Sequence, residues 1–232
     1  MNIIKAKDIM TQHLTVMIYG TPGMGKTSLL GNLKGRTLIV DVDKGTSVLS
    51  GSENVDIVRL DNGADELRQI INELKTHCEY DNVCIDSLSE LEGSMLSELG
   101  RKGRNNGVPE LGDYNRVDCF LIDWCRMARE IPANVFFTAW EKYTELILPS
   151  GEKVTAVRPM LRDKNIERVC GLCDIVGRIE IDRETRERVV CLEGSPRKIA
   201  KDRIYKRQWS RFEDIIPEMT QEGEQTNGEL EV

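Results

Sequence analysis

Apolar and polar positions alternate along the chain in blocks that predict strands and helices in turn. Short apolar runs rich in β-branched residues predict buried strands over residues 14–19, 37–40, 55–58, 82–85 and 135–139. Between these runs, apolar residues recur at helical spacing over residues 65–77, 88–99 and 117–131, with a polar loop over 100–113. Strands that alternate with helices indicate an α/β fold with a mostly parallel sheet flanked by helices.

The pattern changes after Trp140. Residues 144–148 and 153–157 flank a Pro-Ser-Gly-Glu turn, which predicts a β-hairpin. Further strands are expected over residues 175–181 and 188–192. These closely spaced strands predict an antiparallel C-terminal extension of the sheet.

The composition indicates a cellular compartment and shows an uneven distribution of charge along the chain. No run of about eighteen apolar residues or secretory signal is present, and the seven cysteines are scattered, which favours reduced thiols in a cytoplasmic protein without a membrane segment. Residues 142–211 carry 17 basic and 11 acidic side chains within a chain of net charge −7. This basic stretch suits a polyanion, and a solvated surface is an equal alternative. The polar, acidic end predicts one domain over 1–216 and a disordered tail over 217–232.

The segment from Gly20 to Thr27 has the pattern G-x-x-x-x-G-K-T of a phosphate-binding loop, or P-loop. Its glycines let backbone N–H groups point at phosphate oxygens. Lys26 is expected to reach the β- and γ-phosphates, and the Thr27 hydroxyl to bind Mg²⁺. No Asn-Lys-x-Asp guanine motif is present, which favours ATP over GTP. The residues expected to bind ATP are Gly20, Thr21, Pro22, Gly23, Met24, Gly25, Lys26, Thr27 and Ser28.

Carboxylates follow two other predicted strands, at the sheet edge where open α/β sheets bind their ligands. Asp86 ends the strand over 82–85 and is predicted to bind Mg²⁺, with helix N-capping as the alternative. Asp41 and Asp43 end the strand over 37–40. Asp43 is a candidate catalytic residue that would orient and polarise the attacking water, and an equal alternative is that both carboxylates begin a turn.

Three segments resemble motifs of RecA-like recombinases. Ile85-Asp86-Ser87-Leu88 has the Asp-Ser form of their magnesium motif, and Asp43 stands where their Asp-x-Glu carries the water-activating carboxylate. Ala200-Lys201-Asp202-Arg203 resembles the Lys-Asn-Arg element of the RadA group, whose cations reach the nucleotide of a neighbouring protomer. With the P-loop, residues 12–205 resemble short phage RecA-like ATPases, often labelled AAA-domain proteins and related to single-strand annealing recombination proteins.

The resemblance implies a RecA-like P-loop NTPase core that couples nucleotide state to single-stranded DNA in recombination, repair or replication, with a single-strand binding protein as a further partner. It also implies a homo-oligomer in which Lys201 and Arg203 are catalytic in trans, against the alternative of ordinary surface cations. Where RecA-like proteins often carry Gln or His after the strand over 135–139, this chain has Thr138-Ala139-Trp140-Glu141. Because Asp43 is also shorter than Glu, we expect hydrolysis that is slow or stimulated by a partner.

The polar loop over 100–113 has basic side chains about where recombinases present a DNA-binding loop. Arg101, Lys102 and Arg104 would meet phosphates, and an ordinary mobile loop is the alternative. Two other functions remain open, a P-loop small-molecule kinase and a non-hydrolysing, ATP-dependent interaction module. The pair Cys170 and Cys173 lacks the further ligands of a zinc site and is interpreted as core thiols.

Overall fold

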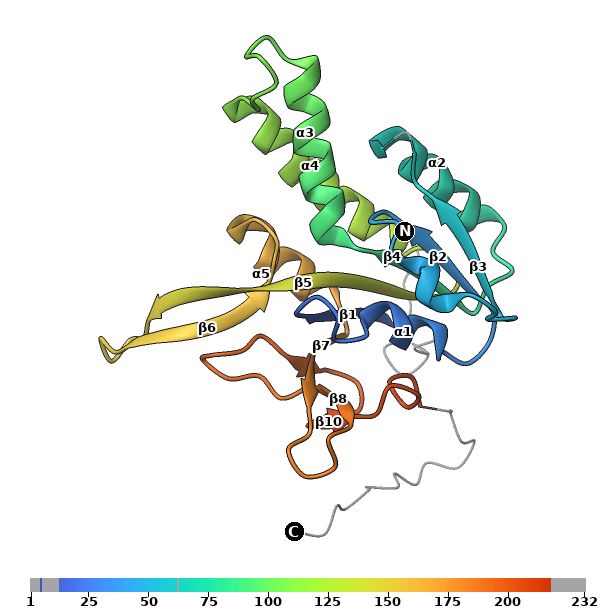
Figure 1. Ribbon diagram of the computed structural model, residues 1–232, viewed down its shortest axis with the longest axis vertical. Helices are drawn as coiled ribbons and strands as arrows, with labels where there is room; N and C mark the ends of the chain where they lie inside the picture. The colour runs from blue at the N-terminus through green and yellow to red at the C-terminus, as the bar shows by residue number, and fades with distance from the viewer. Residues whose placement is uncertain (1–4, 6–12, 62, 218–232) are drawn as a thin grey trace.

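A ten-stranded sheet runs through the part of the chain that the computed structural model describes, residues 5, 13–61 and 63–217 (Figure 1). Its strands are β1 (Thr15–Gly20), β2 (Thr37–Asp41), β3 (Val55–Arg59), β4 (Asn82–Asp86), β5 (Asn134–Ile147), β6 (Lys153–Pro159), β7 (Ile175–Ile181), β8 (Arg188–Cys191), β9 (Lys201–Asp202) and β10 (Trp209–Ser210). Their order is β10-β8-β7-β1-β5-β4-β2-β3, with β6 beside β5 and β9 beside β7. The strand β5 therefore separates β1 from β4.

The predicted fold class is confirmed, with one correction to the extension. Strands β1, β2, β3, β4, β5 and β7 pair in parallel, whereas β6, β8, β9 and β10 pair antiparallel. We expected β7 to belong to the antiparallel extension, but it lies parallel to β1 and itself carries β8 and β9. The helix α5 (Asp163–Leu172) precedes β7 and supplies the long crossover that a parallel return requires.

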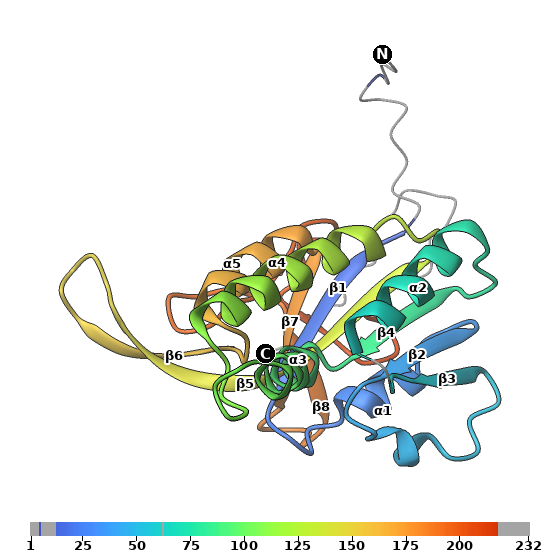
Figure 2. The ribbon, with the colours of Figure 1, turned by 90° about the horizontal axis from the view of Figure 1, so that it is seen from above.

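Helices cover both faces of the sheet (Figure 2). The remaining helices are α1 (Lys26–Gly31), α2 (Gly63–Thr76), α3 (Leu88–Lys102), α4 (Leu111–Ala128) and a 3₁₀ helix (Thr46–Leu49). In β1, Met17 and Tyr19 pack into the core under α2 to α5, while Val16 and Ile18 pack toward α1. Successive strand residues point to opposite faces, so a strand covered on both sides is apolar throughout.

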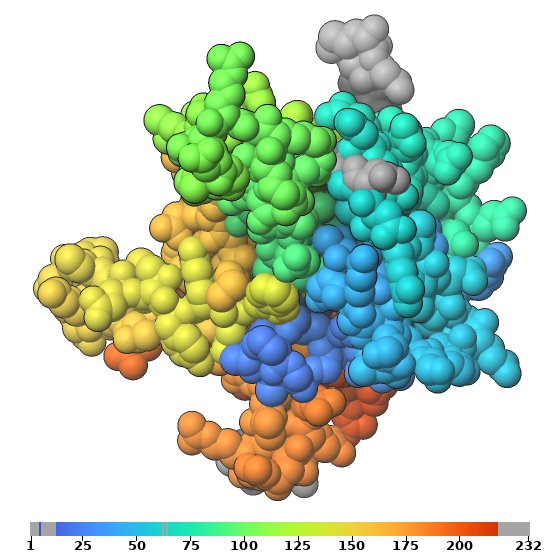
Figure 3. All heavy atoms as spheres, turned by 45° about the horizontal axis from the view of Figure 1, so that its top comes forward, coloured from blue at the N-terminus to red at the C-terminus, as the bar shows by residue number. Residues whose placement is uncertain are grey.

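Two boundaries differ from the prediction. The strand β5 continues without a break to Ile147 and, with β6, forms a ribbon that protrudes from the body (Figure 3). The helix α4 begins at Leu111, because the side chains of Glu110 and Asp113 form a capping box with the first turn. Since Glu110 is not one of the usual N-cap residues, this start was missed, and the loop shortens to residues 103–110.

The described residues bear on the expectations for the cysteines, for membrane segments and for the acidic tail. All seven cysteines are free thiols, and Cys170 and Cys173 are buried, as the core interpretation required. Within the described ranges, no helix has the length and apolar character needed to cross a bilayer. Apart from Pro217, the predicted acidic tail lies outside the described residues.

Candidate nucleotide-binding site

The P-loop joins the end of β1 to the start of α1. Gly23 and Gly25 have φ angles of +82° and +88°, the left-handed region in which glycine avoids a Cβ clash. The Lys26 side chain is buried and folds back, so that Nζ donates to the carbonyl oxygens of Gly20 and Thr21 at 3.0 Å each. Burial lowers the pKa of Lys26, and the charges of nearby carboxylates oppose this shift. The loop thus holds one ammonium group at its centre.

Asp86 lies directly beside the P-loop. Thr27 Oγ1 donates to Asp86 Oδ2 at 2.7 Å, and Thr138 of the intervening strand β5 donates to Oδ1. The N-cap of α3 is Ser87, whose Oγ accepts the N–H of Glu90 at 3.3 Å. The capping alternative for Asp86 is therefore wrong, because the following residue takes that position.

Asp43 lies at the end of the neighbouring strand. In the parallel register Asp41 faces Asp86, so Asp43 follows beyond the same edge. Burial and then the negative charge of Asp86 raise the pKa of Asp43 to about 6. The turn is held mainly by the buried Asp41, which accepts from Thr46 Oγ1 at 2.6 Å and from Gly45 N at 3.2 Å. Asp43 also accepts from Gly45 N, at 3.0 Å, so it serves the turn with one oxygen.

The residues present fit Mg²⁺. Thr27 offers a hydroxyl oxygen and Asp86 a carboxylate, and Mg²⁺ prefers hard oxygen ligands. Among the described residues, no group of three or more His, Cys, Asp or Glu side chains could hold a metal ion. A magnesium ion would therefore take its other ligands from phosphates and water, which is its usual mode with nucleotides.

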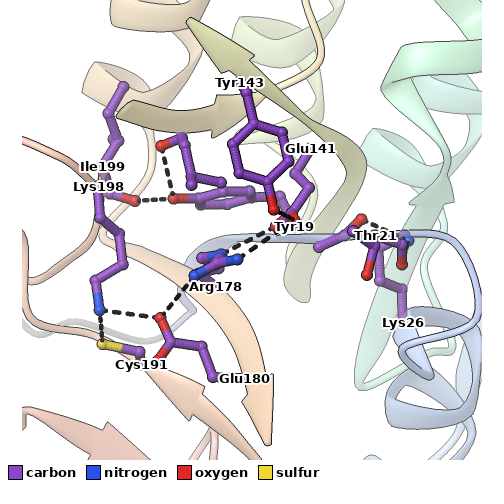
Figure 4. A network of polar contacts seen from close by, with 12 residues as sticks. Tyr19, Thr21, Lys26, Glu141, Tyr143, Arg178, Glu180, Cys191, Lys198 and Ile199 are labelled. Carbon is purple, nitrogen blue, oxygen red and sulfur yellow. Dashed lines mark hydrogen bonds and ion pairs between the residues drawn. The ribbon is translucent and has the colours of Figure 1, made fainter. Parts of the chain in front are cut away.

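An ion pair that the sequence did not predict crosses β1 just before the P-loop (Figure 4). Strands β5 and β7 flank β1, and Arg178 of β7 donates to Glu141 of β5 at 2.9 and 3.3 Å. The Glu141 side chain is only 2% exposed. Charged residues within strands carry no sequence signal for their partner, because strand order decides which strands become neighbours. The pair ties together the two strands beside the P-loop.

The structure does not bring Lys201 and Arg203 into the chain's own site. Strand β9 pairs with the first residues of β7. Arg203 N donates to the carbonyl of Asp174 at 3.0 Å, and the Asp174 carboxylate accepts the N–H of Thr15 at the start of β1. The P-loop follows the other end of β1. A role in trans stays a prediction.

The basic residues Arg101, Lys102 and Arg104 are exposed at the far end of α3. The helix begins next to Asp86 and runs away from the sheet, so these side chains lie at its opposite end (Figure 1). They are not part of the phosphate site.

A P-loop on a parallel sheet, with a carboxylate hydrogen-bonded to its threonine, defines the class of P-loop nucleoside triphosphatases. Residues 12–204 match the family model described as "AAA domain", and the chain belongs to this family. Among solved structures, it is similar to the KaiC-like protein PH0186 from Pyrococcus horikoshii OT3, with 15% identity, 77% of each chain covered and a TM-score of 0.44. No curated protein matches the sequence.

Proposed function

We propose that this protein is a Mg²⁺-dependent ATPase. The observation that carries the proposal is the convergence of Lys26, Thr27, Asp86 and Asp43 at one edge of the sheet. These are the side chains that phosphoryl transfer to water requires: a cation for the phosphates, two oxygen ligands for a metal and a carboxylate for the attacking water.

Each side chain has a separate task in the proposed reaction. The loop N–H groups and the Lys26 ammonium bind the phosphates, while Thr27 and Asp86 hold Mg²⁺. Bound Mg²⁺ would neutralise charge on the β- and γ-phosphate oxygens. Asp43, with a pKa of about 6, is mostly ionised at neutral pH and orients the attacking water as a proton acceptor.

The proposal extends to single-stranded DNA, in recombination, repair or replication of the phage type. Arg101, Lys102 and Arg104 are exposed and can meet a phosphate backbone. They lie far along α3 from Asp86, so DNA would act on turnover through this helix, which begins two residues after the carboxylate. In a homo-oligomer, Lys201 and Arg203 would complete the site of a neighbour, and a single-strand binding protein would be a further partner.

The deciding experiment measures phosphate release from ATP, with and without Mg²⁺ and single-stranded DNA. Wild type is expected to turn over slowly and faster with DNA, while Lys26→Ala is expected to be inactive. A variant with alanine at the three basic loop residues should lose the stimulation. Its control carries alanine at three exposed arginines elsewhere, Arg68, Arg126 and Arg129.

Each alternative function has its own outcome in this assay. Binding of ATP without turnover under any condition would indicate an interaction module, and phosphate transfer to a small molecule would indicate a kinase. Unchanged turnover in Lys26→Ala would mean that the P-loop is not the site.

A further inference from the structure

One arginine lies against the P-loop from within the same chain. Arg188 is the first residue of β8 and pairs with Ile181, the last residue of β7. Because β7 runs parallel to β1, its last residue lies at the sheet edge of the P-loop. A Cβ added to Gly25 would be 2.9 Å from Nη1 of Arg188 and 3.5 Å from its Cζ. The guanidinium group therefore rests on the last glycine of the loop.

The guanidinium of Arg188 has no polar partner among the residues that the structure describes. Within the described residues, Arg188 forms neither a side-chain hydrogen bond nor an ion pair, and the side chain is exposed. The contrast with Arg178 on the adjoining strand is clear, because that arginine is held by Glu141 and Glu180. Glu187 and Glu213 also border this arginine's surroundings, but neither forms an ion pair with it among the described residues. A guanidinium without an ion pair, beside a loop built for phosphate, is available to an anion.

The backbone position of Arg188 is set by a tightly bonded turn. Asp182 Oδ1 accepts the N–H groups of Glu184 and Thr185 at 2.9 and 2.8 Å. The backbone N–H of Asp182 also donates to the carbonyl of Glu187 at 2.8 Å. The orange β7–β8 segment lies directly beside the blue P-loop segment in the space-filling view (Figure 3). The turn thus fixes the backbone of Arg188 next to the P-loop.

A hollow of about 330 Å³ adjoins Arg188 on the side of α1. Ser28 of α1 and the C-cap residue Asn32 border it, Glu187 lies beside Arg188, and Arg211, Phe212 and Glu213 close it from the C-terminal segment. Ser28 directly follows the P-loop threonine, so the hollow begins where the loop ends. Arg188 borders this hollow and also lies against Gly25, so it stands between the P-loop and the hollow.

We propose that Arg188 binds the phosphate chain of the nucleotide held by its own chain's P-loop, where that chain turns toward the hollow beside α1. The proposal rests on the proposed nucleotide binding. Arg188 is then a phosphate-binding cation that β8 of the same chain supplies from outside the P-loop. This role is independent of any role of Lys201 and Arg203 in a neighbouring protomer.

The test compares the dissociation constants of ATP and ADP for wild type, Arg188→Ala and Arg188→Lys. Charged hydrogen bonds of this kind predict about a ten- to hundredfold weaker binding for Arg188→Ala. Arg188→Lys should recover part of the affinity, since it keeps the charge but not the planar fork. The control is Arg183→Ala, an exposed arginine in the turn of the same hairpin, with expected wild-type affinity. Thermal melting without nucleotide should be equal for all four proteins.

Mixing Arg188→Ala with Lys26→Ala protein separates action within the chain from action across subunits. If Arg188 serves its own P-loop, the mixture gains no tight site, and recovery of tight binding would overturn the assignment. Arg188→Ala that binds ADP within about twofold of wild type would also overturn it, while tight wild-type binding would leave the nucleotide site standing. Wild type that binds no nucleotide would instead overturn the proposed function itself.

Discussion

The burial of the ion pair between Glu141 and Arg178 determines how much stability the protein should lose when the pair is broken. The side chains are 2% and 23% exposed, so solvent screens them little. Replacing Arg178 by Met leaves a buried carboxylate without its cation, and such a loss costs about 3–5 kcal/mol. Glu180 keeps a partner, because Lys198 Nζ remains 3.0 Å away. We therefore expect Arg178→Met to lose about 3–5 kcal/mol of unfolding free energy.

The assay is equilibrium unfolding in urea, supported by thermal melting. For a domain of this size, about 1 kcal/mol corresponds to roughly 2–4 °C, so a melting-point drop of about 6–20 °C is expected. The double variant Glu141→Leu with Arg178→Met should recover most of the loss, since an apolar pair of similar volume is often neutral.

The matched control for this prediction is Arg158→Met. Arg158 contacts Glu167 at 3.0 Å, a similar distance, but the Glu167 side chain is 70% exposed, so the expected cost is below about 1 kcal/mol. The reasoning would be refuted if Arg178→Met lost no more than this control, or if the double variant were no more stable than the single one.

Two further predictions concern buried carboxylates. Thr138→Val keeps the shape of the side chain but removes its hydrogen bond to Asp86, so urea unfolding without nucleotide should show a loss of about 1.5–3 kcal/mol; equal stability would contradict the contact. Burial raises the pKa of Glu92, which accepts from Arg162 N and Asn165 Nδ2 at 2.8 Å each, so the folded state binds its proton more tightly than the unfolded state. The stabilisation that protonated Glu92 gives the folded state is therefore fully present below the ordinary carboxyl pKa. It is lost as pH rises through the raised pKa of the folded state. The stability of wild type relative to Glu92→Gln should therefore fall as pH rises above the ordinary carboxyl pKa of about 4, and a constant difference would refute this sign.

Much of the fold could be predicted because its signals are local. The apolar runs and helical spacings identified the parallel strands, and β7 was predicted over residues 175–181 as observed. The predicted antiparallel direction of β7 was wrong, because nothing within those residues indicates that they pair with β1. The single long strand β5 was missed for a related reason. Its outer half, from Glu141 onward, pairs with β6 instead of with β1 and β4, and so alternates like an independent hairpin.

The candidate site likewise has one part that local motifs predict and another part that depends on the tertiary structure. The position of Asp86 beside the P-loop could be predicted, since each is a short motif next to a recognisable strand. Thr138 could not, because its contact with Asp86 requires that β5 lie between β1 and β4. Lys201 and Arg203 were chosen by resemblance to a motif, and pairing of β9 with the start of β7 keeps them from their own loop.

By itself, then, the sequence determined the chemistry that eight consecutive residues contain, because the bends, N–H groups, ammonium and hydroxyl of Gly20 to Thr27 need no distant partner. Only the tertiary structure decided what surrounds that loop. Strand order and register bring the Glu141–Arg178 ion pair to the strand that precedes the loop, and Arg188 to the loop itself. This order depends on the pairing of β1 with β5 and β7, whose residues lie more than a hundred positions away, and no local pattern along the chain records such pairing.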